Sequence, residues 1–402
     1  MRKIEPKILL LPVHRSIMKS VSEVKWALNI MEDVNASFEG VINVVGEVDD
    51  SVVRNLRLSE SSSLITLHTG INYSIKSDLV FYGKLFITGL RVLFSHEIDI
   101  IHHVMPLGVG SGFNPVFIVT RRPKKVVGPI LYPYSTPDAK NFFEGYGIRY
   151  NRLDVNAFKP LFTILFILTI RSSDAVIVDS VETLKIIETM YPKVKGKKVH
   201  ILPGGGQDKE IFTPFNQEGD LDHYTLGVLS YHTKNKNIDT ILKALSKSRL
   251  LNVQLKIGGA GPQTQELKLL SNDLGIAERV KFLGELRAED APNFYHGVDV
   301  QIVAVLNPPT LNASIQEALM SGCAIIAPDL KSDSGHTLLP YGILVGDKSP
   351  EGFAKAIEII TSDRMKLAEM KKNARRFAEE NLSTIVIRKK LERIYAELFA
   401  AK

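Results

Sequence analysis

The sequence predicts an α/β protein made of two doubly wound domains, each built on a mostly parallel sheet. The chain has 402 residues, which is enough for two domains of ordinary size. Between residues 225 and 296, short apolar runs alternate with amphipathic ones, the pattern of a parallel sheet covered by helices. Residues 299–329 show the repeating unit most plainly, as strand, loop, helix, turn and strand.

The N-terminal half begins with an apolar strand at Lys7–Leu11 and a helix at Val21–Met31. Because the apolar start is short, ends at Pro12 and lacks a small-residue cleavage site, a first strand is favoured over a signal peptide. A helix is expected at Asp78–Phe94, where core packing explains the helical spacing of the apolar residues. Further strands are expected at Val41–Val45, Leu64–Leu67, Asp99–His103, Val126–Leu131, Ala175–Val178 and Val199–Leu202.

Three segments of this half raise the question of a membrane surface. Leu161–Ile170 is the most apolar run but is too short to span a bilayer, so a buried helix is favoured over an interfacial one. The basic clusters Arg121–Lys125 and Lys193–Lys198 are interpreted first as solvated turns. The alternative is docking on anionic lipid, where each basic side chain adds roughly 1 kcal/mol.

The C-terminal half follows a linker at Pro203–Phe215, whose glycines, Gly205 among them, permit a hinge or a close approach of backbone to a ligand. The chain closes with two charged amphipathic helices. Strands are expected at Thr225–Ser230, Val253–Ile257, Val280–Leu283, Val300–Leu306 and Ala324–Ala327, and helices at Ile238–Ser246, Gln263–Leu274, Ala288–His296, Met365–Ala378 and Thr384–Ala400.

Composition narrows the function classes. The chain is 45% hydrophobic and 23% charged with a net charge of +6, an ordinary globular balance with a moderate basic excess. Because no basic motif is interleaved with aromatic residues, nucleic acid is not an expected partner, whereas phosphorylated substrates and anionic lipid are. The single cysteine, Cys323, lies in an apolar run, which fits a reducing compartment. No Cys/His or His/Asp spacing suggests a metal site.

Three stretches of the C-terminal half are typical of an anion site. Asn312 can cap a helix that follows a buried strand, and helix N-termini at the carboxyl ends of parallel strands bind anions. Glu317 lies one turn into that helix. The turn Gly258–Pro262 leaves a strand for a helix, so its amides are candidates for cradling phosphate. Lys236 opens the helix after the first strand of this half.

These stretches, in this order and spacing, resemble the retaining glycosyltransferases of family 4, most strongly from about residue 170 to residue 350. The matching residues are Pro203–Asp208 with Phe212–Pro214, Gly227–Leu229 with Lys236–Asp239, Leu255–Pro262, Arg279–Gly284 and Glu317–Gly322.

The resemblance implies the GT-B fold, with two Rossmann-like domains that face each other across a cleft. On this basis residues 1–210 form the N-terminal, acceptor-side domain, 211–380 bind the nucleotide sugar, and 381–402 pack back toward the N-terminal domain. The implied activity is transfer of a sugar, with retention and without a metal or other cofactor, from a UDP- or GDP-linked donor to a lipid or glycan acceptor. A role in surface-glycan assembly is implied too. A cytoplasmic location is expected, and the basic clusters with Leu161–Ile170 keep peripheral contact on an anionic membrane as an option.

The resemblance also assigns site residues. Lys236 corresponds to the lysine that contacts the nucleotide diphosphate, and Glu317 to the glutamate that binds the ribose hydroxyls. Gly258, Gly259, Gly261, Asn312 and Gly205 line the expected donor site. A histidine at a strand end near the donor sugar falls on His102 or His103, a choice that the sequence leaves open.

Three departures from the family pattern keep other functions open. Pro309 stands where the family has a glutamate that touches the donor sugar, so Thr310 or Asn307 would have to take over that contact. Val228 stands where the family has a second, basic diphosphate contact, for which Lys234 is a substitute, and the loop 13–16 has no glycine. The alternatives are a non-catalytic GT-B protein that binds a nucleotide or a partner transferase, and a GT-B epimerase.

Overall fold

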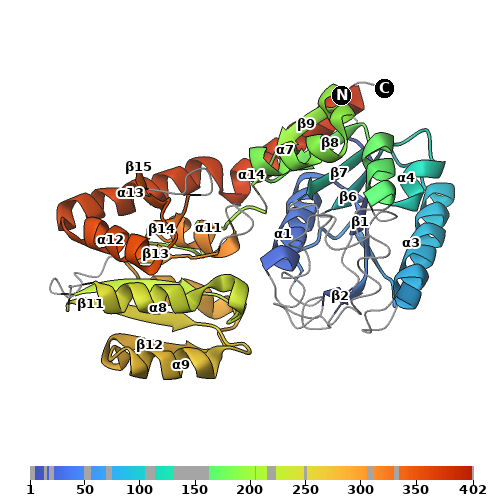
Figure 1. Ribbon diagram of the computed structural model, residues 1–402. Helices are drawn as coiled ribbons and strands as arrows, with labels where there is room; N and C mark the ends of the chain where they lie inside the picture. Colours follow the sequence, from blue (N-terminus) through green and yellow to red (C-terminus); the bar gives the residue numbers. More distant parts are fainter. Residues whose placement is uncertain are drawn as a thin grey trace. The chain divides into compact units, whose positions relative to one another are not determined.

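The structure is a computed structural model that describes residues 5–12, 16–17, 22–48, 56–68, 75–104, 114–130, 163–203, 205–214, 223–248, 251–305, 312–329 and 335–400. The chain divides into two compact units (Figure 1). Unit 1 comprises Met1–Gly206 with Thr384–Lys402, and unit 2 comprises Gln207–Ser383. The sequence-based boundaries were 210/211 and 380/381, a few residues from these points.

Unit 1 is built on a seven-stranded parallel sheet in the order β5-β3-β1-β6-β7-β8-β9. Its strands are β1 (Ile8–Pro12), β3 (Ile42–Val45), β5 (Ser63–Thr66), β6 (Ile100–Val104), β7 (Lys124–Ile130), β8 (Ala175–Val178) and β9 (Lys198–Ile201), and β2 (Ser16–Ile17) pairs separately with β4 (Glu47–Val48).

Helices cover both faces of this sheet. On one face Leu9 and Leu11 of β1 pack in a core with Phe81, Leu85 and Phe117. On the other face α1 packs against α14, the last helix of the chain (Figure 1). The helices of unit 1 are α1 (Ser22–Ser37), α3 (Ile75–Ser95), α4 (Pro115–Val119), α7 (Val181–Met190), α14 (Thr384–Ala400) and the helical residues 163–172, with the short 3-10 helix η1 (Pro192–Gly196).

Unit 2 has a second seven-stranded sheet, in the order β12-β11-β10-β13-β14-β16-β15, in which only β15 is antiparallel to its neighbour. The strands are β10 (Tyr224–Leu229), β11 (Val253–Gly258), β12 (Val280–Gly284), β13 (Val300–Ile302), β14 (Ala324–Pro328), β15 (His336–Leu339) and β16 (Gly342–Val345). The expected strand Val300–Leu306 is shorter than predicted, because the paired segment ends at Ile302.

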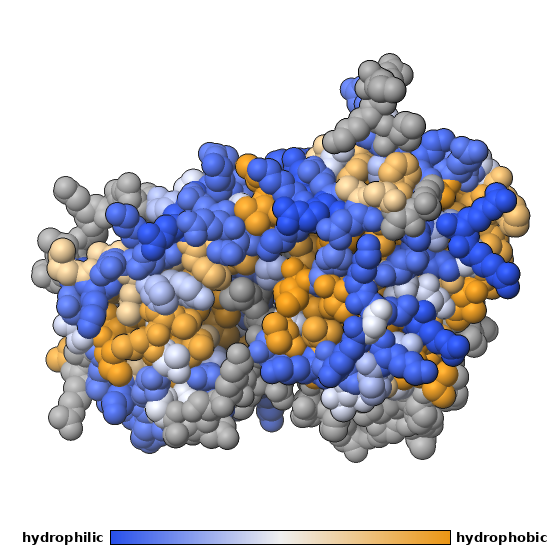
Figure 2. All heavy atoms as spheres, turned by 90° about the horizontal axis from the view of Figure 1, so that it is seen from above, coloured by the Kyte–Doolittle hydropathy of each residue, from blue (hydrophilic) through white to orange (hydrophobic). Residues whose placement is uncertain are grey.

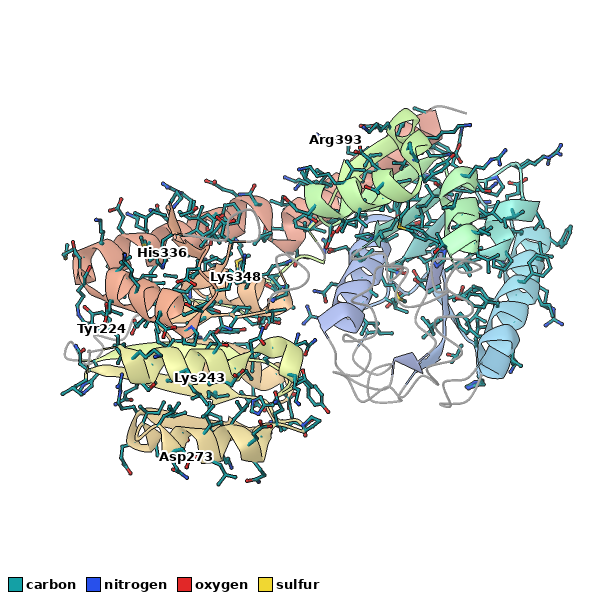
Figure 3. The ribbon with its side chains drawn as sticks, viewed as in Figure 1. Tyr224, Lys243, Asp273, His336, Lys348 and Arg393 are labelled. Carbon is teal, nitrogen blue, oxygen red and sulfur yellow. The ribbon has the colours of Figure 1, made fainter. Side chains whose placement is uncertain are left out.

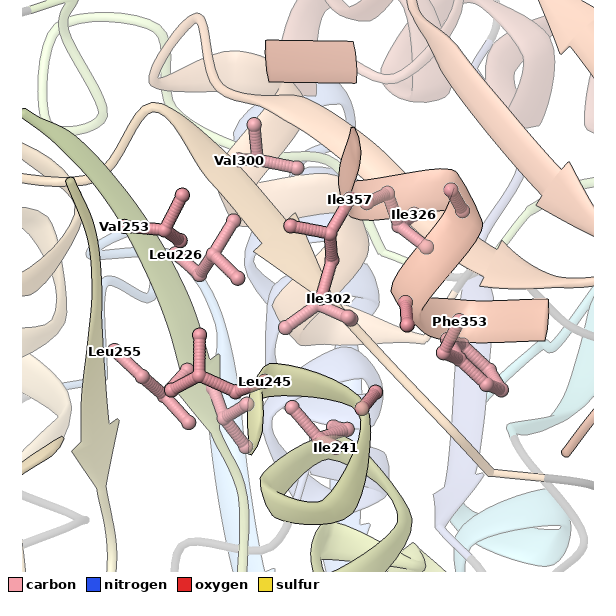
Figure 4. Close-up of a cluster of buried hydrophobic side chains, with 14 of the residues drawn as sticks. Leu226, Ile241, Leu245, Val253, Leu255, Val300, Ile302, Ile326, Phe353 and Ile357 are labelled. Atoms are coloured by element: carbon pink, nitrogen blue, oxygen red, sulfur yellow. The ribbon is translucent and has the colours of Figure 1, made fainter. Parts of the chain in front are cut away.

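The helices of unit 2 also lie on both faces of their sheet. They are α8 (Ile238–Lys247), α9 (Thr264–Asp273), α10 (Ala291–Tyr295), α11 (Ala313–Met320), α12 (Pro350–Thr361) and α13 (Arg364–Asn381), with the 3-10 turns η2 (Lys234–Lys236), η3 (Ala277–Arg279) and η4 (Ala288–Asp290). One face carries a core of branched aliphatic side chains in which Leu226 and Ile302 of the strands meet Ile241, Phe353 and Ile357 of α8 and α12 (Figure 4). Helices α10 and α11 belong to a core on the other face.

The strand order of unit 2 reverses between β10 and β13. The chain runs outward from β10 to β11 and β12, then returns to place β13 on the other side of β10. In doubly wound sheets, ligands bind outside the carboxyl ends of the strands at such a reversal. The loop after β10 and the segment after β13 flank this point, and the loop after β11 lies one strand away.

Candidate nucleotide site in unit 2

The loop after β10 places Lys236 at the carboxyl end of that strand. Residues 234–236 form the turn η2, and the backbone N–H of Lys236 donates to Thr233 O at 3.0 Å. Asn237 then adopts a left-handed conformation with φ 49°, and its side-chain amide donates to Ala304 O at 3.0 Å. Because Ala304 follows β13, this bond joins the Lys236 loop to the segment on the other side of the reversal.

The turn after β11 requires its glycines for close packing. Gly259 has a φ of +109°, and a Cβ atom there would lie 1.9 Å from Ser230 O. A Cβ atom on Gly261 would lie 2.5 Å from His232 O, and one on Gly258 would lie 2.8 Å from a methyl carbon of Leu286. The glycines therefore let this turn press against the backbone of the loop that carries Lys236.

Two amides of this turn are occupied within the protein. Gly259 N donates to Gly284 O at 2.7 Å, and Gly261 N donates to the Thr264 hydroxyl at 2.9 Å. The sequence-based expectation was that such amides cradle phosphate, but these two already have acceptors. In this structure Gly259 and Gly261 instead let the turn pack closely against the loop after β10.

A buried histidine that no motif singled out joins the same two loops. His232 is fully buried, and its Nδ1 lies 2.9 Å from the hydroxyl of Thr264. That hydroxyl also donates to Gly261 O at 2.8 Å, so one side chain joins His232 to the glycine turn. Burial lowers the pKa of His232, so the neutral ring is the native form. His232 and Thr264 could be recognised only once the fold brought them together.

Helix α11 begins after the segment that follows β13. Asn312 caps it, since its side-chain oxygen accepts from Ile315 N at 3.0 Å and from the Ser314 hydroxyl at 2.8 Å. Asn312 thus has a capping role, and the partial positive charge of the helix N-terminus lies at the carboxyl end of β13. Thr310, Pro309 and Asn307 lie outside the described residues, so the structure does not place the expected donor-sugar contact.

Glu317 is buried on the core side of α11, with 6% of its surface exposed. The hydroxyl of Tyr295, at the end of α10, lies 3.3 Å from Glu317 Oε2 and 3.0 Å from Ser314 O. Tyr295 is itself 1% exposed, and burial with the nearby carboxylate raises the pKa of its phenol well above the usual value. The neutral hydroxyl is therefore a permanent donor to α11, a role that the sequence motifs did not reveal.

Three other positions of the family motif lie in different environments. Val228 is 3% exposed and packs in the core between the sheet and α8, so its side chain does not point to the ligand edge of the sheet. Lys234 is exposed at the start of η2, and its role as substitute stays a prediction. Asp239 pairs with Lys243 on α8 at 2.8 Å, and both side chains are half-exposed. Figure 3 labels Lys243 on this helix.

The two histidines of β6 lie in unit 1 and point to opposite faces of its sheet. His102 Nε2 lies 2.7 Å from Gly128 O, and because a carbonyl only accepts, Nε2 carries the proton. Nδ1 therefore accepts from the hydroxyl of Tyr395 on α14. Both ring nitrogens of His102 are used inside unit 1.

His103 packs edge-on against Phe117, and its Nδ1 is buried without a hydrogen-bond partner among the described residues. Burial lowers the pKa of His102 to about 4 and that of His103 to about 3. The contacts therefore favour His103 over His102 as a histidine with a nitrogen to offer a ligand. Gly205 also belongs to unit 1, where it is buried at the end of the unit, and the Asn29 amide donates to the neighbouring Gly206 O at 2.8 Å.

No group of three or more His, Cys, Asp or Glu side chains in the described ranges is placed to hold a metal ion. No described helix is long and apolar enough to cross a membrane. Cys323 is buried, and burial raises the pKa of its thiol to about 12.

Comparison with known proteins places unit 2 in a family. The model of "Glycosyl transferases group 1" matches residues 208–377, nearly all of this unit. The lipopolysaccharide core biosynthesis glycosyltransferase LpsE of Rhizobium meliloti is 29% identical over 175 residues, 42% of this chain and 47% of LpsE. A GDP-mannose-dependent phosphatidylinositol monomannoside mannosyltransferase of Mycolicibacterium smegmatis is 26% identical over 198 residues, 45% of this chain and 52% of that protein. The chain thus spans about half the length of these curated relatives.

Solved structures extend the likeness to both units. HepE of Anabaena in complex with UDP superimposes with a TM-score of 0.69 at 17% identity, over 97% of this chain and 100% of HepE. At this identity the likeness establishes the fold. Residues 208–377 thus form a domain that matches the group 1 glycosyl transferases, and the chain as a whole has the two-domain GT-B fold of the solved structures.

Proposed function

We propose that the protein transfers a sugar from a nucleotide-sugar donor, UDP- or GDP-linked, to a lipid or glycan acceptor, with retention of anomeric configuration and without a metal ion. The observation that carries the proposal is the convergence of Lys236, the glycine turn and the start of α11 at the strand-order reversal of a group 1 glycosyltransferase domain. The names of the relatives support it, since HepE is seen with UDP and the mycobacterial relative uses GDP-mannose.

The chemistry follows from these positions. The bond between the sugar and the diphosphate breaks through an oxocarbenium-like state, and negative charge develops on the departing diphosphate. Lys236 and the N-terminus of α11 would stabilise that charge without having to reorganise. Glu317, held from behind by Tyr295, would accept hydrogen bonds from the ribose hydroxyls. The acceptor oxygen then bonds to the anomeric carbon in place of the diphosphate, and the hydroxyl proton passes to an oxygen of the departing diphosphate.

The acceptor and the cellular setting belong to the same proposal. The names of LpsE and the mannosyltransferase point to glycan and lipid acceptors in those proteins, which supports surface-glycan assembly here. A nucleotide-sugar donor and one buried cysteine fit a cytoplasmic location.

The test is turnover of a panel of UDP- and GDP-sugars with mixed lipid and glycan acceptors. We expect Lys236→Ala to lower kcat by about 10²–10³, the usual cost of losing one group that stabilises transition-state charge. Lys243→Ala is the matched control. Lys243 lies seven residues after Lys236, in α8, and it pairs with the half-exposed Asp239 rather than lying at the end of β10. Equal activity of Lys236→Ala and the wild type would contradict the assignment.

A second function is favoured by one observation, the burial of Val228 in the core where the family has a basic residue. The protein would then be a non-catalytic member that binds a nucleotide or a partner transferase. It predicts a nucleotide-dependent rise in melting temperature with no turnover of any donor, with or without acceptor. Isomerised nucleotide sugar in the absence of acceptor would instead identify an epimerase.

A further inference from the structure

Helix α3 of unit 1 carries apolar side chains on the face that points away from the core. Its inner face is buried through Phe81 and Leu85. On the outer face Val80 is 43% exposed, Ile87 52% and Phe94 87%. These three residues are seven apart, and a seven-residue step is nearly two full turns, so they form one stripe along the helix.

Basic side chains lie beside this stripe, and acidic ones are absent from its sequence. Lys84 and Arg91 each follow a stripe residue by four positions, which makes them its neighbours on the helix surface. The Lys84 ammonium also donates to His68 O. Residues 80–95 contain no Asp or Glu. We call Val80, Lys84, Ile87, Arg91 and Phe94 the outer α3 stripe.

The surface around this helix adds more apolar area. Helix α4 packs against α3, where a Cβ atom on Gly89 would lie 2.7 Å from a methyl carbon of Val116. Two residues of α4 are exposed, Ile118 by 45% and Val119 by 54%. Figure 2 shows apolar side chains, in orange, lying among blue ones on the face that it displays. Exposed apolar residues grouped on one helix mark an interaction site more often than scattered ones do.

Several basic side chains of the clusters that the sequence suggested for lipid docking already have partners within the protein. Lys125 is buried and donates to Thr120 O, while Lys124 pairs with Asp174 at 3.8 Å. Lys197 donates to Arg171 O at 2.9 Å and to Ser173 O. Lys124 and Lys197 thus hold the turn at residues 171–174, and Lys125 holds Thr120, so all three are poor candidates for a membrane contact.

From this arrangement we propose that the outer α3 stripe is a docking surface for an anionic bilayer. Phe94, Ile87 and Val80 enter the boundary between headgroups and acyl chains, and Arg91 pairs with lipid phosphates. Apolar residues flanked by basic ones, with no carboxylate between, complement such a surface in both charge and hydropathy. Glu97, three residues after Phe94, is exposed and pairs with Lys7 at 3.7 Å. The proposal rests on no step of the proposed chemistry.

The experiment is co-sedimentation of the full chain with phosphatidylcholine vesicles, with and without phosphatidylglycerol, at low and high salt. We expect binding to the anionic vesicles that weakens with salt. The triple variant Val80→Ser, Ile87→Ser, Phe94→Ser should bind at least about tenfold more weakly, and Arg91→Ala about fivefold. The matched control is Leu251→Ser with Met365→Ser, since these unit 2 residues are 85% and 81% exposed. Melting curves check that each variant is folded.

Three results would overturn the proposal. The first is a wild-type chain that does not sediment with anionic vesicles at low salt. The second is a triple variant that binds them as well as the wild type or the control does. The third is a triple variant that loses self-association in lipid-free sedimentation velocity but keeps its vesicle binding, which would make the stripe a contact between copies of the chain.

Discussion

The hydroxyl of Tyr295 lies within hydrogen-bond distance of the Glu317 carboxylate, and Tyr295→Phe removes this hydroxyl while leaving the ring. The ring contacts Phe294 and Phe212 at centroid distances of 5.2 and 6.3 Å, so packing should persist. The hydroxyl has one proton for two acceptors, Ser314 O at 3.0 Å and Glu317 Oε2 at 3.3 Å. Losing a donor to buried acceptors costs about 1–3 kcal/mol. We expect unit 2 to unfold about 1–2 kcal/mol more easily, within that range.

The effect on binding separates a positioning role from a merely structural one. If Glu317 binds ribose hydroxyls, Tyr295→Phe should weaken UDP binding by about 1 kcal/mol, or about fivefold. Binding of 2′-deoxyuridine 5′-diphosphate, which lacks one partner for Glu317, should weaken less. Titration calorimetry of both ligands measures this difference, and Tyr341→Phe is the control, since Tyr341 is a half-buried ring stacked on Phe377 in the same unit. Equal losses for both nucleotides would refute the reasoning.

Two further predictions concern the glycine turn and the buried histidines. Gly259→Ala should destabilise unit 2 by about 3 kcal/mol or more in urea unfolding, because the new Cβ meets backbone atoms at a φ of +109°. The control Gly275→Ala, at φ +66° with open space around the Cβ, should cost about 1 kcal/mol. Equal costs would refute the close packing. The pKa values of His102 and His103 are lowered from 6.5 to about 4 and about 3, so the unfolded chain takes up protons first and stability falls as pH drops below about 6.5. His102→Gln should reduce the loss of unfolding free energy between pH 6.5 and pH 4 by up to about 3 kcal/mol. The fluorescence of Trp26, the single tryptophan, follows unfolding at each pH. An unchanged pH dependence of stability would refute the assignment.

Much of the fold could be predicted because its strongest signals are local. The strands β10 and β11 appear in the sequence as short segments rich in apolar residues, and the helix α8 between them appears as an amphipathic segment. All three lie where expected. Helix α12 was not among the predicted elements, although Ser349 caps it and Pro350 opens it. The antiparallel edge strand β15 was missed too, since half of its residues are exposed and its pattern is weak.

The site could be predicted only as far as the positions of its residues along the strands. Motif order placed Lys236, the glycine turn and Glu317 at strand ends, and the parallel sheet then brought those ends to one edge. What each group does depends on its partners, and partners are set by tertiary contacts that spacing does not encode. His232 is the clearest case, since it matches no motif yet joins the two loops through Thr264.

The pair of histidines in β6 shows the same limit from the other side. The motif predicted a histidine at a strand end but left two candidates, because adjacent residues on a strand differ only in the face they point to. The choice between His102 and His103 follows from their neighbours. Gly128 O accepts a hydrogen bond from Nε2 of His102, and the Tyr395 hydroxyl donates one to its Nδ1. A ring with both nitrogens so engaged joins α14 to the sheet of unit 1, and it would have to give up a buried hydrogen bond before it could bind a sugar. His103 faces no such cost, since its Nδ1 has no partner among the described residues, and this leaves it the better candidate for the motif histidine.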